Sequence, residues 1–109
     1  MDARPLKDFT GEIAGVGVPR AGHIPGSKSI YWMDMLVSRE NPVLKPESEL
    51  RKMFAVAGAQ PGGRVVTYCR TGVQASVSYF VAKYLGYDAA MYDGSFLEWS
   101  KAEGTAVEK

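Results

Sequence analysis

The sequence is poor in the residues that form disulfides and bind metals. Its 109 residues include one cysteine, Cys69, and one histidine, His23. A single cysteine excludes an internal disulfide, and the two residues together are too few soft ligands for a structural zinc site. We therefore expect no metal and no cofactor. A reducing compartment follows as the default, so we expect the cytoplasm, with the periplasm as the alternative.

Long hydrophobic runs and an excess of one charge are also missing. No apolar run approaches the roughly 20 residues that a membrane helix needs, and residues 1–5 lack the apolar core of a signal peptide. The formal net charge is +1, which does not favour nucleic-acid binding. Hydrophobic residues make up 46% and charged residues 23% of the chain. This composition predicts one small globular domain over residues 1–109, with neither a membrane nor a nucleic acid as partner.

What the sequence does contain is a strand, a turn and a helix around Cys69. A β-branched run at 65–67 predicts a buried strand, and apolar residues at helical spacing predict a helix over 73–85 that ends before Gly86. Cys69 lies in the turn between them, where free main-chain N–H groups and the helix dipole favour an anion. Gly72 allows several amides to point at one sulfur. We expect this thiol to ionise readily and to act as a nucleophile. The alternative is a small buried hydrophobic residue.

The remaining elements alternate between helix and strand signals. Before the Cys69 segment we expect a turn and connecting loop over Met1–Val18, apolar side chains at Tyr31–Val37 lying on the sheet, and a helix that starts at Pro46 and ends at Gly58. After it we expect a short strand at Asp88–Tyr92 and a helical turn at Phe96–Ser100, with Phe96 and Trp99 facing inward. The tail from Ala102 to Lys109 is expected to be loosely held. This alternation predicts an α/β fold with a mostly parallel sheet. In such sheets ligands bind outside the carboxyl ends of the strands, which is where Cys69 lies.

Four motifs, in order, resemble those of the rhodanese (sulfurtransferase) family. They are Asp2-Ala3-Arg4, Gly22-His23-Ile24-Pro25-Gly26, the six-residue loop from Cys69 to Gln74, and Asp93-Gly94-Ser95-Phe96-Leu97-Glu98-Trp99. The last resembles the segment near the end of tandem-domain thiosulfate sulfurtransferases. The resemblance covers nearly the whole chain. It implies a three-layer α/β/α fold and identifies the chain with the C-terminal catalytic domain of those enzymes.

The resemblance also implies a reaction. Cys69 would take a sulfane sulfur from thiosulfate, hold it as a persulfide and pass it to cyanide or a thiol acceptor. Amides of the loop would bind the donor and the persulfide, so the expected substrate-binding residues are Arg70, Thr71, Gly72, Val73 and Gln74. A basic residue at Arg70 favours thiosulfate, whereas mercaptopyruvate-type loops more often carry small residues there. Because Thr71 stands where a second basic residue is common, 3-mercaptopyruvate stays open as the donor. Two arrangements are then open for the sulfonate: Arg70 and the amides hold it alone, or Arg4 and Lys28 assist.

Five residues outside the loop are expected to support the site. They are Asp2, Arg4, Trp32, Asp93 and Ser95. For Arg70 an outward ion pair with Asp2 is as reasonable an expectation as contact with substrate. Trp32 is expected in the core or the pocket wall. We expect His23 to be a structural hydrogen bonder and Asp93 and Ser95 to fix a turn beside the site.

One departure from the family pattern concerns the start of the chain. In the family, Asp-x-Arg ends an apolar strand inside the sheet, beside the cysteine strand. Here only Met1 precedes Asp2, so the N-terminal strands are missing and a long backbone edge should be exposed. Two hypotheses follow. Either the sequence is the C-terminal part of a longer tandem-domain protein, or a partner chain supplies the strand.

Two other functions compete with the enzyme. A non-catalytic persulfide carrier or interaction domain would use the same thiol, and the missing strands favour it by leaving the loop less fixed. A phosphatase or arsenate reductase would need an arginine at the position that Ala75 occupies. Because this arginine is missing, phosphate chemistry is the least favoured of the three functions.

Overall fold

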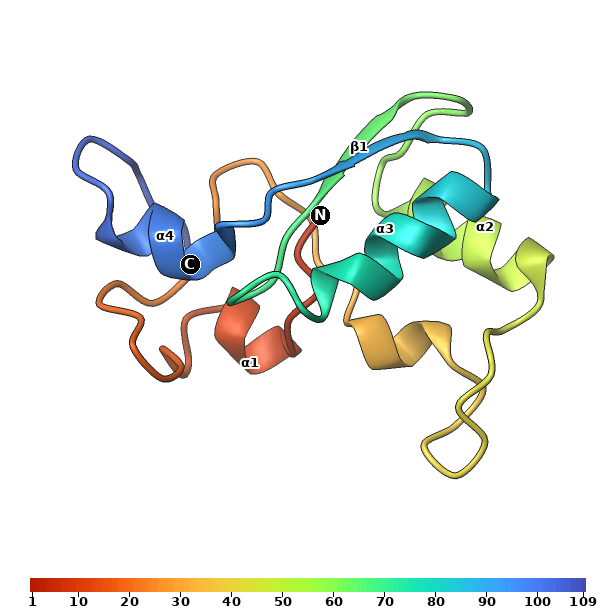
Figure 1. The fold of residues 1–109 in the computed structure, drawn as a ribbon, viewed down its shortest axis with the longest axis horizontal. Helices are drawn as coiled ribbons and strands as arrows, with labels where there is room; N and C mark the ends of the chain where they lie inside the picture. Colours follow the sequence, from red (N-terminus) through yellow and green to blue (C-terminus); the bar gives the residue numbers. More distant parts are fainter.

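One strand precedes the Cys69 turn, and a second, parallel strand follows the helix after that turn. In this computed structural model, which describes residues 1–109, β1 (Arg64–Thr67) pairs with β2 (Asp88–Met91) from Arg64 opposite Asp88 to Thr67 opposite Met91. The connection between them runs through α3 (Ala75–Tyr84), which lies along the pair in Figure 1. A helical crossover is the usual link between parallel strands. The predicted strands and the predicted helix are confirmed, but β1 is buried on one face only, because Val66 is exposed.

The sheet continues past β1 through shorter pairings. Asp2 forms parallel bridges with Tyr68 on one side and with Ser29 on the other. The spatial order is therefore residues 28–30, residues 1–3, β1 and β2. Figure 1 shows the amino terminus beside β1. All of these pairings are parallel, which confirms the mostly parallel sheet, and β1 has only the first residues of the chain along its second edge.

Helices cover both faces of this sheet. α2 (Glu47–Val56) and α3 pack on one face around Leu50, Phe54 and Val81, and this core includes Val65 of β1. On the other face, Phe96 of α4 (Ser95–Lys101) packs against Tyr68. The result is the expected α/β/α arrangement, with the Cys69 turn at the carboxyl end of β1.

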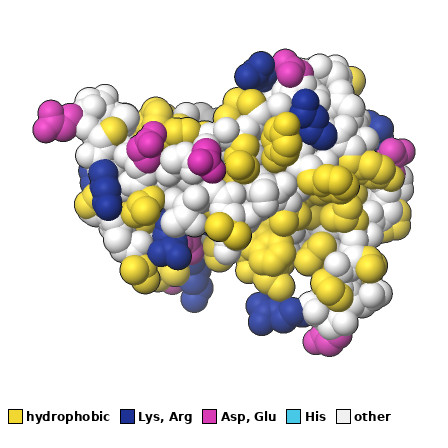
Figure 2. All heavy atoms as spheres, in the orientation of Figure 1, with side chains coloured by type: hydrophobic (Ala, Val, Ile, Leu, Met, Phe, Trp, Pro, Cys, Tyr) yellow, Lys and Arg dark blue, Asp and Glu magenta, His cyan; other side chains and the backbone are white.

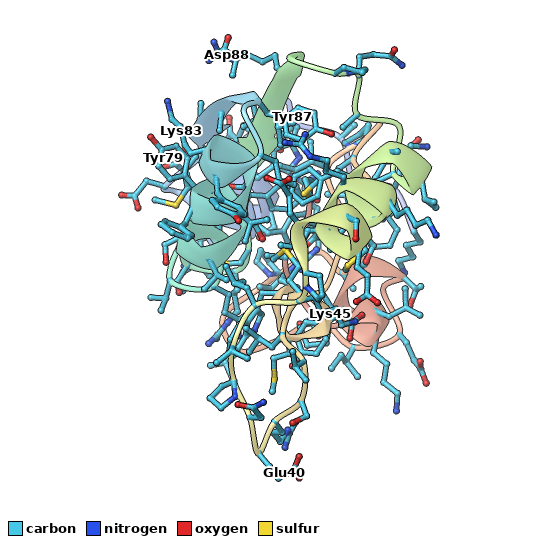
Figure 3. The ribbon with its side chains drawn as sticks, turned by 90° about the vertical axis from the view of Figure 1, so that its right-hand side faces the viewer. Glu40, Lys45, Tyr79, Lys83, Tyr87 and Asp88 are labelled. Carbon is cyan, nitrogen blue, oxygen red and sulfur yellow. The ribbon has the colours of Figure 1, made fainter.

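Glycines end the two longer helices where the sequence predicts. Gly58 follows α2 with φ +94°, and Gly86 follows α3 with φ +91°. These angles favour glycine because it has no Cβ. Pro46 is the N-cap of α2 rather than its first residue. Figure 3 shows Tyr87 between α2 and α3, where its ring stacks on Phe54 at 5.3 Å between centroids.

The first third of the chain contains two short elements that the sequence analysis does not predict. α1 (Leu6–Phe9) forms one helical turn after Pro5, within the stretch expected to be a turn and connecting loop. Trp32–Met35 forms a 3₁₀ helix, η1, and its Met35 and Trp32 side chains pack with the core that includes Val65 of β1, as expected for apolar side chains on the sheet. Each element is a single turn, too short to show a hydrophobic period. Contacts with distant residues fix both, such as the hydrogen bond from Trp32 N–H to Ala3 O at 3.1 Å.

The tail is held firmly, contrary to the prediction. His23 and Glu108 exchange two main-chain hydrogen bonds, of 2.7 and 2.9 Å. The indole N–H of half-buried Trp99 donates to Ala106 O at 2.7 Å. The Arg20 guanidinium donates to Thr105 O at 2.7 Å and to Ser100 O at 2.9 Å. These contacts tie the end of the chain to its first quarter.

Apolar side chains remain exposed on the side of α2 and α3. Figure 2 shows hydrophobic atoms gathered over this half of the molecule. The exposed large hydrophobic residues of these helices and of the turn before α3 are Val56, Val73, Phe80 and Tyr84. No helix is both long and apolar enough to cross a bilayer.

Candidate active site

Cys69 lies two residues after the end of β1 and six residues before α3. Its residue is 1% exposed and packs against Ala3 and Ala75, with Trp32 and Met91 alongside. A pocket of about 250 Å³ nevertheless opens on it, lined by Cys69, Arg70, Thr71, Val73 and Gln74. The thiol therefore has apolar packing on one side and a solvent-accessible pocket on the other. This is not the fully enclosed position of a cysteine that only fills the core.

Gly72 provides a hydrogen bond to the sulfur. Its main-chain N–H donates to Cys69 Sγ at 2.9 Å, and a donor in this place stabilises negative charge on sulfur. The residue adopts φ +102°, and a Cβ on it would lie 2.9 Å from Asp93 O. Only glycine fits this turn without strain.

The other amides of the turn are available for a ligand. We expected several of them to reach the sulfur, but only the Gly72 N–H does so. The N–H groups of Thr71, Val73 and Gln74 donate to no acceptor within the chain, and all three residues line the pocket. They lie just before α3, where unpaired amides favour an anionic group.

The start of α4 holds the Cys69 backbone from behind. Cys69 N–H donates to Ser95 Oγ at 3.1 Å, and Cys69 O accepts from Phe96 N–H at 2.8 Å. The Ser95 hydroxyl itself donates to Tyr92 O at 2.9 Å. Ser95 is fully buried and is the one non-glycine residue with positive φ, at +54°. This conformation places its hydroxyl where the Cys69 amide needs an acceptor, a role consistent with the turn-fixing function predicted for Ser95.

We expect Ser95→Ala to lower the free energy of unfolding by about 1–3 kcal/mol, because the buried Cys69 N–H loses its acceptor. The loosened turn should also lower the rate of the sulfur transfer that the sequence resemblance predicts, by about tenfold. The measurements are thermal unfolding and thiocyanate formation from thiosulfate and cyanide.

Ser100→Ala is the matched control for this variant. Ser100 lies in the same helix and donates its hydroxyl to Leu97 O at 3.2 Å, away from Cys69. It should leave turnover unchanged. Equal turnover in Ser95→Ala and in the unsubstituted protein would show that the Ser95 hydroxyl does not position the thiol.

Arg70 borders the pocket but does not form the ion pair considered from the sequence. Its Nη1 donates to Val16 O at 3.0 Å, while Asp2 pairs with Arg4 instead. The turn that contains Val16 was missed as part of the site. Its signal was the glycine spacing at Gly15 and Gly17, which have φ +90° and +79°. A Cβ at Gly15 would lie 3.5 Å from Arg70 Cδ, so this turn determines where the Arg70 side chain rests.

Arg4 and Asp2 form a buried ion pair beneath the site. Their closest approach is 2.7 Å, between Arg4 Nη2 and Asp2 Oδ2, and their side chains are 1% and 0% exposed. Arg4 Nη2 also donates to Gly22 O at 2.6 Å, and the guanidinium lies 4.2 Å from the centroid of the Phe96 ring. Arg4 does not line the Cys69 pocket, and Lys28 lines a different groove. Of the two arrangements considered from the sequence, this geometry favours the one in which Arg70 and the amides hold the donor without Arg4 or Lys28.

The other motif residues have structural contacts. Trp32 packs between the core and the Cys69 cluster, as predicted for a wall residue. His23 stacks on Phe9 at 3.8 Å, and its Nδ1 lies 2.7 Å from Phe9 O. The Tyr68 hydroxyl accepts from Ile24 N–H at 3.1 Å, and burial raises the pKa of this phenol well above its usual value, with the Asp2 charge adding to the shift. No group of three His, Cys, Asp or Glu residues could hold a metal ion.

Comparison with known proteins gives one consistent result. A family model described as a rhodanese-like domain matches residues 1–102. The chain is 33% identical to a thiosulfate sulfurtransferase of Corynebacterium glutamicum over 99% of its own length and 37% of the relative's. It is 36% identical to the sulfur carrier protein TtuD of Thermus thermophilus, over 100% of the chain and 40% of the relative.

A solved structure agrees with these relatives. A crystal structure named as a probable thiosulfate sulfurtransferase superposes with a TM-score of 0.75 at 31% identity, covering 99% of this chain and 41% of the other. The chain thus spans about 40% of the length of the relatives that it matches.

Proposed function

The chain belongs to the rhodanese-like family, and from this premise we propose that it transfers sulfane sulfur through a persulfide on Cys69. The observation that carries the proposal is the Gly72 N–H donated to Cys69 Sγ at 2.9 Å, in a pocket at the carboxyl end of β1. A nucleophilic sulfur needs access, a fixed backbone and a donor for its negative charge. Cys69 has all three.

The reaction has two steps. In the first, the Cys69 thiolate attacks the outer sulfur of thiosulfate, the S–S bond of thiosulfate breaks, and sulfite leaves with the bonding electron pair. In the second, the carbon of cyanide or the sulfur of an acceptor thiol attacks the terminal sulfur of the persulfide. The S–S bond between Cys69 Sγ and that sulfur breaks, and the Cys69 thiolate is regenerated. No second cysteine is required, because the acceptor resolves the persulfide.

Thiosulfate is the donor that the pocket favours. Its sulfonate oxygens are acceptors, and the unpaired amides of Thr71, Val73 and Gln74, which line the pocket, are matching donors. Arg70 adds a positive charge at the rim, held by Val16 O. The alternative donor is 3-mercaptopyruvate, whose carboxylate would use the same amides. A donor panel distinguishes the two.

A persulfide carrier is the second candidate function. The similarity to a protein named as a sulfur carrier favours it, and a carrier would load Cys69 without sustained turnover. The partners of either function are a small sulfur donor and a thiol or cyanide acceptor. In both cases we propose that residues 1–109 are the part of a longer tandem-domain protein that carries the reactive cysteine, and that this protein is located in the cytoplasm.

The test is intact mass spectrometry of the protein after exposure to each donor. We expect a gain of one sulfur atom with thiosulfate, reversed by cyanide. Because Cys69 is the only cysteine, the added mass is assigned without digestion. The Cys69→Ser protein is the control and should gain nothing.

The possible results separate the candidates. Repeated thiocyanate release supports the enzyme, whereas one equivalent of persulfide without further turnover supports the carrier. No adduct with any sulfane donor, together with hydrolysis of p-nitrophenyl phosphate, would replace the proposal with phosphatase chemistry.

A further inference from the structure

Asp8 in α1 is a buried carboxylate without a partner in the chain. The residue is 9% exposed, and none of the ion pairs includes it. Its side chain does not cap α1, and the nearby Thr10 hydroxyl donates to Lys7 O instead. The buried Arg4 guanidinium pairs with Asp2. Buried charges are normally paired or hydrogen-bonded, so this carboxylate points to a cation on which it acts over a longer distance.

The cation that faces this carboxylate is Arg70. A Cβ on Gly15 would lie 3.4 Å from Asp8 Oδ2 and 3.5 Å from Arg70 Cδ. The two side chains therefore approach the same point of the 15–17 turn, and Gly15 places no side chain between them. A methyl group of buried Val18 would lie 3.8 Å from that point. Figure 1 shows the turn after β1 passing beside α1, in agreement with these distances.

Arg70 is the one charged residue that lines the Cys69 pocket. Its guanidinium does not contact the sulfur, because Nη1 donates to Val16 O at 3.0 Å, and the donor to Cys69 Sγ is the Gly72 N–H. The charge that an anionic ligand meets in the pocket therefore depends on two things. One is where the Arg70 guanidinium rests, and the other is how far a neighbouring negative charge offsets it.

Two interactions keep the guanidinium over the 15–17 turn. The hydrogen bond to Val16 O fixes its direction, and the Asp8 carboxylate attracts it. Because Asp8 is buried, water and salt screen this attraction less than they screen a surface pair. A guanidinium that turned toward a donor bound at Cys69 would lose the hydrogen bond and move away from the carboxylate. Asp8 therefore favours the withdrawn position of Arg70.

We propose that Asp8 is a positioning residue for Arg70, and that it limits the preference of the Cys69 pocket for donors with two negative charges. It holds the guanidinium at the rim and offsets part of its charge. Donors with one negative charge, or none, then compete with dianionic thiosulfate better than they would in a pocket where Arg70 is free. This inference rests on the proposed function, because the Cys69 pocket has to be the donor site.

The test compares the alkylation of Cys69 by iodoacetate, which is an anion, with its alkylation by iodoacetamide, which is neutral. Cys69 is the only cysteine, and both reagents react with the same thiolate. The ratio of the two rates therefore reports the charge in the pocket and not the ionisation of the thiol. We expect Asp8→Asn to raise the iodoacetate-to-iodoacetamide ratio at least about threefold, because Arg70 is then free to turn toward the sulfur. Arg70→Gln should lower the ratio by a similar factor.

A double variant shows whether Asp8 acts through Arg70. In the Arg70→Gln protein, Asp8→Asn should change the ratio by less than about 1.5-fold, because the side chain that Asp8 positions is gone. Asp88→Asn is the matched control. It removes the same charge from an exposed side chain at the start of β2, at the other end of the sheet, and it should leave the ratio unchanged. An unchanged ratio in Asp8→Asn, or an equal change with and without Arg70, would overturn the proposal.

Steady-state kinetics give a second readout. Asp8→Asn should lower KM for thiosulfate about threefold and leave kcat within about twofold, because Arg70 would bind the donor's charge equally in the ground state and the transition state. The change should be smaller for 3-mercaptopyruvate, which carries a single carboxylate. A KM for thiosulfate that stays the same or rises would contradict the proposal. The alkylation ratio requires only an accessible thiolate. A raised ratio in a protein without sulfur transfer would therefore reject the proposed function and support the role of Asp8.

Discussion

Cys69→Ser abolishes sulfur transfer while leaving the fold intact: this is the first result we expect. Sulfur transfer depends on a thiolate that accepts a sulfur atom, and a serine hydroxyl cannot replace it. Thiocyanate formation should fall by at least about 10³-fold, to the rate of the uncatalysed mixture. The assay is colorimetric thiocyanate release at saturating thiosulfate.

The stability of this variant is its internal control. Serine is close to cysteine in size, and its Oγ can accept the Gly72 N–H that Sγ accepts at 2.9 Å. We therefore expect the free energy of unfolding to change by no more than about 1 kcal/mol. Lost turnover with unchanged Tm assigns the loss to chemistry, whereas thiocyanate release at the original rate by the serine protein would remove Cys69 from the mechanism.

Asp2→Asn has the largest expected effect on stability. The substitution leaves Arg4 with a buried positive charge and no counterion, although the asparagine oxygen can still accept the Arg4 main-chain N–H that Asp2 Oδ1 accepts at 2.9 Å. Breaking one half of a buried ion pair costs about 3–5 kcal/mol. At about 4–8 °C per kcal/mol, Tm should fall by at least about 12 °C. Thermal unfolding followed by circular dichroism measures this.

The chain supplies a matched control on its surface. Arg64 and Asp88 also pair, at 3.2 Å, but both side chains are 63% exposed. Asp88→Asn removes the same charge in water, and it should cost no more than about 0.5 kcal/mol. Adding Arg4→Met to Asp2→Asn should recover part of the loss, because no unpaired charge remains. A similar, small Tm change for Asp2→Asn and Asp88→Asn would show that burial does not strengthen the Asp2–Arg4 pair.

The central part of the fold could be predicted because its signals are local. The strand before Cys69, the helix after it and the glycine that ends the helix occupy consecutive residues with clear spacing. The motif resemblance then supplied the layer architecture. The single turns at Leu6–Phe9 and Trp32–Met35 could not be found in the same way, since four residues are too few for a period to be seen.

The parts of the site that sequence missed depend on distant contacts. Arg70 is 54 residues from the Val16 carbonyl that holds it, and no local pattern predicts such a pairing. The position of Ser95 beneath Cys69 N–H was anticipated only as a turn near the site. Its left-handed backbone conformation is unusual for serine and becomes evident only in three dimensions.

The pairing of His23 with Glu108 has a consequence for the order of assembly during synthesis. The two residues are 85 positions apart, and Arg20 reaches Thr105 over the same span. A ribosome releases the first quarter of the chain long before these partners emerge. Residues 20–23 therefore form their final contacts only after nearly the whole chain has been synthesised. In nascent chains stalled before residue 105, we expect proteases to cleave near residues 20–23.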